Sequence, residues 1–153
     1  MRRTEPSGEP RPHSQAGAKV AIAGRDKGKN AAALKKLPGA ITLEADLKDE
    51  KACRAAVDEA AKQLGRLDVL VNNAGYGVRG RVEETPAESY EKLMAVNYLG
   101  TVYGCQAAVP VMRRQGSGVI INDSSIVGHR AVPGGGAFVA AKWATDRFSA
   151  TLA

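Results

Sequence analysis

The feature that most constrains the fold is an alternation of short apolar runs with longer helical stretches. The apolar runs lie at residues 18–24, 40–46, 68–75 and 117–123, and each ends in Gly, Asp or Asn. Runs of this length and composition are typical of buried strands. Between them, residues 27–37, 49–64 and 86–115 have helix-favouring composition, as does a last stretch from about Ala137. The order predicts an α/β fold around a parallel sheet.

Signals at the ends of the helices sharpen this prediction. Asp26 is expected to cap the first helix, and Gly65 is placed to end the second. Thr85 and Pro86 are expected to open the long helix as its N-cap and first residue. That helix is expected to bend near Gly100 and Pro110, and the last helix is expected to run to the end of the chain.

Composition limits the classes of protein to which the chain can belong. With 153 residues, 44% of them hydrophobic, the chain is long enough for one folded domain. Residues 1–17 contain three prolines and little to bury, so we expect a disordered tail followed by a partial domain over residues 18–153. The net charge of +6 comes from cations scattered among glutamates, which favours solvated faces over a nucleic-acid surface. No apolar run is long enough for a membrane span.

The two cysteines, Cys53 and Cys105, stand apart without the spacing of a metal site or a disulfide framework. We interpret them as small packing residues in a reducing compartment, which makes the cytoplasm the expected location, and we expect no metal.

Polar and glycine residues follow every predicted strand. They are Arg25 after Gly24, Asp46, the sequence Asn-Asn-Ala-Gly at 72–75, and the serine pair at 124–125. Ligands of open parallel sheets bind beyond the carboxyl ends of the strands, so these residues predict a single site. Phe138 and Lys142 are four residues apart and share a helix face beside that site. A hydroxyl and an ammonium placed there would polarise a carbonyl group.

In their order and separation, these residues resemble the short-chain dehydrogenase/reductase family. The matching features are NNAG at 72–75, Asn97 within VNYLG, Ser125 after a strand, and Lys142 as the last residue of the family's YxxxK motif. The resemblance implies a Rossmann-like doubly wound parallel sheet with helices on both faces. It also implies NAD(P)-dependent interconversion of a carbonyl and a secondary alcohol on a small-molecule substrate.

The resemblance also implies a role for each matching position. Ser125 would hold the substrate oxygen, Asn97 would position a water in a proton relay, and Lys142 would bond the nicotinamide ribose. The cofactor would further meet the backbone of Asn73, Ala74 and Gly75, and Asp46 would contact the adenine. Arg25 beside a small residue suits a 2′-phosphate, which favours NADP over NAD, although an ordinary exposed arginine explains the same residue equally well.

Phe138 departs from the family pattern because it stands at the catalytic tyrosine position and carries no exchangeable proton. Loss of a general acid typically costs ~10²–10⁴ in rate. The family's first strand with its TGxxxGxG loop is not found before residue 18, and its later strands do not follow the last helix. We therefore expect an incomplete fold, truncated at both ends, with weakened cofactor binding and little or no activity.

Two other hypotheses remain open on the sequence. One is a non-catalytic fragment that associates with itself or with an intact relative through the helix at 86–115 and the helix from 138. The other is a frameshifted or misassigned reading frame without a biochemical role. The sequence does not specify the substrate.

Overall fold

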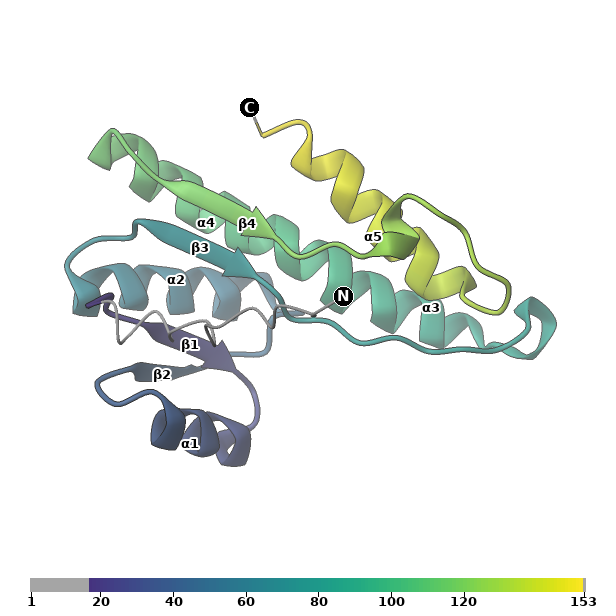
Figure 1. Ribbon diagram of the computed structural model, residues 1–153, viewed down its shortest axis with the longest axis horizontal. Coiled ribbons are helices and arrows are strands. Elements are labelled where there is room, and N and C mark those ends of the chain that lie inside the picture. Colours follow the sequence, from purple (N-terminus) through teal and green to yellow (C-terminus); the bar gives the residue numbers. More distant parts are fainter. Residues whose placement is uncertain (1–16, 153) are drawn as a thin grey trace, which may run out of the picture. The chain divides into compact units, whose positions relative to one another are not determined.

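A computed structural model describes residues 17–152 as two compact units that divide after Glu44. The predicted tail falls almost entirely on residues 1–16, which lie outside the described part, and Gly17 occupies a turn with a φ of +83°. Each unit contains one pair of parallel strands (Figure 1). The parallel pairs joined by helices are those of a partial Rossmann-like α/β fold.

The first unit is a strand, a helix and a second strand. β1 (Ala21–Gly24) pairs in parallel with β2 (Ile41–Glu44), with Ala21 opposite Ile41. The connecting helix α1 (Lys27–Lys36) begins as predicted, because the side chain of Asp26 accepts a hydrogen bond of 2.9 Å from the backbone amide of Lys29. A helix between two strands is the usual connection of neighbouring parallel strands.

The second unit is built on β3 (Val69–Asn72) and β4 (Val119–Asn122), paired in parallel with Asn72 opposite Asn122. The helices α2 (Glu50–Leu64) and α4 (Gly100–Gln115) lie side by side along this pair (Figure 1). α2 ends as predicted at Gly65, which has a φ of +87°. Leu70 and Ile120 face the core, which contains Val57, Leu67, Ala107, Ala108 and Met112. The alternate strand residues, Val69, Val71, Val119 and Ile121, are between 48% and 55% exposed.

The predicted long helix is divided into α3 (Ala87–Met94), a π-helical segment η3 (Ala95–Leu99) and α4. The π-helical turn immediately precedes Gly100, where a bend was expected, whereas Pro110 lies inside α4. A Cβ at Gly100 would stand 3.0 Å from the carbonyl oxygen of Leu47, so glycine permits this close approach. π-helical turns frequently occur at functional sites.

Two predicted helix ends were wrong. Thr85 does not cap α3, because its hydroxyl donates instead to the carbonyl of Arg81 at 2.8 Å across the 3₁₀ turn η2 (Val82–Glu84), and Pro86 takes the N-cap position. The last helix, α5 (Gly136–Ser149), ends before the chain does. The amide and hydroxyl of Thr151 both bond to the carbonyl of Phe148, which closes a turn in place of another helical turn.

None of the helices in residues 17–152 has the length and hydropathy that a membrane span requires.

Candidate functional site

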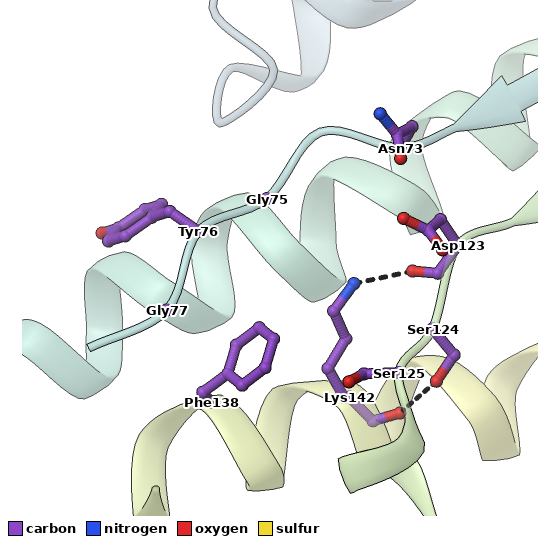
Figure 2. Close-up of a pocket in the computed structure, with 9 residues that line it drawn as sticks. All are labelled: Asn73, Gly75, Tyr76, Gly77, Asp123, Ser124, Ser125, Phe138 and Lys142. Carbon is purple, nitrogen blue, oxygen red and sulfur yellow. Dashed lines mark hydrogen bonds between the residues drawn. The ribbon is translucent and has the colours of Figure 1, made fainter. Parts of the chain in front are cut away.

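A cavity of about 190 Å³ lies within the second unit, where three segments meet (Figure 2). One is the turn after β3, the second is the segment after β4, and the third is the first half of α5. Six of the residues predicted from sequence line this cavity: Asn73, Gly75, Ser124, Ser125, Phe138 and Lys142. The carboxyl ends of β3 and β4 therefore do converge on one site.

Lys142 is the buried cation of the cavity. Its side chain rises from α5, where the residue is only 6% exposed, and Nζ donates a 2.6 Å hydrogen bond to the main-chain oxygen of Asp123 (Figure 2). Nζ also lies 5.8 Å from the centroid of the Phe138 ring. Burial lowers the pKa of the Lys142 amine, and the negative charge of Asp123 opposes this shift.

The two serines after β4 have different partners. Ser124 donates its hydroxyl to the main-chain oxygen of Lys142 at 3.3 Å and so ties this segment to α5. Ser125 caps the short 3₁₀ turn η4 (Ile126–Gly128), since its Oγ accepts from the amide of Val127 at 3.4 Å. Because that bond uses an oxygen lone pair, the Ser125 hydroxyl proton remains available to the cavity.

Phe138 supplies an apolar wall of the cavity. Its ring is half-buried, and a Cβ at Gly77 would stand 3.6 Å from it. The sequence analysis had not placed Tyr76 at the site, yet this residue lines the cavity directly after Gly75. The Tyr76 ring is turned away from Lys142 (Figure 2), so it does not supply the missing phenol in this arrangement.

Asn97 holds the glycine-containing turn from behind. It is 1% exposed in η3, where Oδ1 accepts from the amide of Tyr76 at 3.1 Å and Nδ2 donates to the Tyr76 carbonyl at 2.8 Å. Its main-chain oxygen accepts from the hydroxyls of Thr101 and Thr145, at 3.2 and 3.1 Å. A Cβ at Gly75 would stand 3.1 Å from Asn97 Oδ1, so glycine permits this close approach.

A continuous set of hydrogen bonds connects Asn97 and Thr145 to the ends of β3 and β4. Asn72 donates to Asn122 at 2.8 Å across the strand pair, and Asn122 donates to the hydroxyl of Ser149 at 2.9 Å. Ser149 in turn donates to the carbonyl of Thr145 at 2.7 Å. We call Asn72, Asn97, Asn122, Thr145 and Ser149 the asparagine frame. It fixes β3, β4, η3 and α5 relative to one another.

Three predicted cofactor-binding residues do not line the cavity. Asp46 turns its carboxylate to its own segment, accepting from the amide of Lys48 at 3.1 Å and lying 3.4 Å from the Lys48 ammonium. Ala74 is exposed in the turn after β3, and Arg25 is an exposed residue of the first unit.

Tyr76, Gly77 and Asp123 also line the cavity, and the sequence did not predict them there. Each lies within two residues of a recognised motif, either NNAG at 72–75 or the serine pair at 124–125. That proximity in the sequence was the signal that could have identified them.

A sequence profile described as short chain dehydrogenase matches residues 12–153. The chain belongs to the short-chain dehydrogenase family. Among curated proteins, this member is 39% identical over 116 residues to 2-(R)-hydroxypropyl-CoM dehydrogenase of Xanthobacter autotrophicus, covering 74% of the chain and 46% of the relative. It is 37% identical over 144 residues to L-fucose dehydrogenase of Bos taurus, covering 91% of the chain and 52% of the relative.

Solved structures of short-chain dehydrogenases have the same fold. A short chain dehydrogenase/reductase from Burkholderia phymatum in complex with NAD matches with a TM-score of 0.84 at 28% identity, over 88% of this chain and 50% of that one. One from Streptomyces avermitilis gives a TM-score of 0.85 at 30% identity, over 92% and 52%. This short-chain dehydrogenase thus spans about half the length of the relatives that it matches.

Proposed function

We propose that the cavity takes the nicotinamide–ribose end of a dinucleotide, with NADP favoured over NAD, and that the chain has little or no oxidoreductase turnover as it stands. The observation that carries the proposal is the set of residues at the cavity. Ser125 and Lys142 are present, while the side chain at the tyrosine position, Phe138, has no proton to exchange. The relative from Burkholderia phymatum, which was solved with NAD, supports the cofactor class.

The residues present fit one end of such a cofactor. A buried amine faces the cavity, and the turn at Gly75 brings backbone close to it without a Cβ. The cavity, at about 190 Å³, is smaller than the ~300–1,000 Å³ of typical ligand pockets. It therefore suits part of a dinucleotide. Within the same unit, we assign Asp46 to the adenine and the backbone of Asn73, Ala74 and Gly75 to other contacts with the cofactor. The preference for NADP rests on the sequence alone, in which Arg25 follows the small residue Gly24.

The bound dinucleotide would supply the hydride for carbonyl–alcohol interconversion. Ser125 would donate its hydroxyl proton to a substrate carbonyl oxygen, and Lys142 would bond the ribose. Asn97 would position a relay water while holding the Tyr76 turn. Phe138 would pack against the bound groups, but it can neither donate nor accept the proton that the reaction requires.

The test is a paired measurement of NADPH binding and NADPH oxidation with a panel of small aldehydes and ketones. We expect NADPH fluorescence to change on titration, more than NADH fluorescence does, without oxidation of the cofactor. We also expect Phe138→Tyr to gain no turnover, because a cavity of about 190 Å³ does not enclose cofactor and substrate together. Wild-type turnover near the ~1–10³ s⁻¹ of ordinary enzymes would overturn the proposal.

The second candidate function is a non-catalytic role through association of helices. Two large apolar side chains on the relevant helices favour it, since Leu99 of η3 is 37% exposed and Trp143 of α5 is 43% exposed. Light scattering after size-exclusion chromatography should then show a dimer or larger species that Trp143→Lys dissociates. A monodisperse wild-type monomer would contradict this role.

We also propose a cytoplasmic location, which the buried free thiols of Cys53 and Cys105 support.

A further inference from the structure

Lys142 has an environment that suits a nucleophile as well as a cofactor ligand. Lysines are rarely buried without an acidic partner. Among residues 17–152, however, Lys142 forms no ion pair with a carboxylate, and its Nζ is bonded to the main-chain oxygen of Asp123 at 2.6 Å. A neutral amine that donates one N–H to this carbonyl keeps its lone pair directed elsewhere. The cavity lies beside it (Figure 2).

Burial and a nearby carboxylate act on the protonation of the Lys142 amine in opposite directions. Burial lowers the pKa of Lys142, and the Asp123 carboxylate from the end of β4 partly offsets that effect. Asp146, one turn further along α5, is paired with Arg147 and lies 3.6 Å from His129. Tyr76, from the turn after β3, points its ring away from the cavity (Figure 2).

Phe138 completes the environment. A tyrosine at this position would place an acidic hydroxyl beside Nζ and favour the ammonium form. Phenylalanine offers an apolar face instead, with the amine 5.8 Å from the ring centroid. The cavity volume of about 190 Å³ exceeds the ~150 Å³ of an apolar cavity that accepts benzene, so a single aromatic ring fits.

We propose that Lys142 captures small aldehydes as an imine in this cavity. The amine lone pair attacks the carbonyl carbon, a C–N bond forms, and the π electrons move to the carbonyl oxygen. The oxygen takes up a proton and the nitrogen loses one, which gives a carbinolamine. Loss of water then gives the imine. Ser125 lines the same cavity, and its hydroxyl holds the aldehyde oxygen and directs the carbonyl carbon toward Nζ.

The test uses benzaldehyde and sodium cyanoborohydride at neutral pH, without any dinucleotide. Hydride from the reagent reduces the imine to a stable benzylamine, which peptide mapping by mass spectrometry locates. Lys92 is the internal reference, because it is exposed, pairs with Glu88 at 2.6 Å, and has a pKa raised by that carboxylate. We expect Lys142 to be the most rapidly modified lysine of the folded chain, and this preference to disappear in urea.

Matched variants separate chemistry from folding. Lys142→Arg keeps the charge but forms no imine, so we expect loss of the adduct, whereas Lys92→Arg should leave it unchanged. Phe138→Tyr should slow the labelling of Lys142. Modification of Lys142 no faster than Lys92 in the wild type would overturn the proposal, and this comparison needs no variant to fold. Because no cofactor is present, this result does not decide whether NADPH binds.

Discussion

The two sides of the site are built in opposite ways. Behind the cavity, the asparagine frame satisfies its polar groups from four elements, and Asn97 and Thr145 within it are at most 1% exposed. On the cavity side, Ser125 has one weak bond and Lys142 has one partner, a backbone oxygen. Phe138 contributes no polar atom. Buried, fully bonded networks hold a structure rigidly, whereas groups with few partners remain available to a ligand.

The comparison indicates that the scaffold of the site and its chemistry are separable in this chain. The frame positions the turn after β3 and the start of α5 regardless of which ring stands at position 138. We therefore expect an exchange of phenylalanine and tyrosine at position 138 to change the chemistry of the site more than its shape.

The largest effect on stability is expected for Asn97→Ala. The substitution removes both side-chain bonds to the Tyr76 backbone, so part-buried polar groups lose their partners at a cost of about 2 kcal/mol in the free energy of unfolding. Urea denaturation measures this loss. The control is Gln106→Ala on the exposed side of α4, which should change stability by less than about 0.5 kcal/mol. Equal effects of the two substitutions would mean that Asn97 does not support the turn.

A smaller difference is expected between the two serines. Ser124→Ala should cost about 1 kcal/mol, because the bond to the Lys142 main chain is lost. Ser125→Ala should cost less than about 0.5 kcal/mol, since its bond to the Val127 amide stays within one turn and does not join two segments of the chain. Denaturation curves of both variants under one condition provide the comparison. A larger loss of stability for Ser125→Ala than for Ser124→Ala would mean that Ser125 stabilises the fold and is not simply available to a ligand.

The smallest effect concerns the pH dependence of stability. The pKa of Lys142 is lowered in the folded state by burial, so the unfolded chain binds more protons between the folded pKa and the usual value of 10.5. The contribution of Lys142 to stability therefore rises as the pH rises through this alkaline window. Cys53 and Cys105 act in the opposite direction, because burial raises the pKa of each thiol.

The pH dependence of wild-type stability thus combines the opposing contributions of Lys142 and the two thiols. The variant Lys142→Met isolates the contribution of Lys142. Below the window, we expect the variant to gain stability relative to the wild type, with the difference shrinking as the pH rises. Chemical denaturation at several alkaline pH values measures it. A difference that does not vary with pH would show that Lys142 titrates normally.

Much of the fold followed from the sequence because its determinants are local. Asp26 caps the start of α1 and Gly65 ends α2, through side-chain and backbone preferences that act within a few residues. The spacing from Ser125 to Lys142 likewise placed both residues at one cavity, since it spans a single loop and helix start.

The failures have non-local or competing causes. Thr85 was expected to cap a helix, but its hydroxyl bonds to the preceding turn at Arg81. The two hydrogen bonds between the Asn97 side chain and the Tyr76 backbone join residues 21 positions apart, and no local sequence pattern predicts them. The place of Tyr76 at the cavity, with its ring turned outward, depends on that same contact.

The most direct test of the account is an NADPH fluorescence titration of three proteins: the wild type, Lys142→Met and Lys92→Met. Both substitutions remove one lysine charge, but only the first changes the cavity. We expect a saturable fluorescence response in the wild type and in Lys92→Met, and a weaker one in Lys142→Met. The absence of any wild-type response at millimolar NADPH, or an equal response in all three proteins, would contradict it.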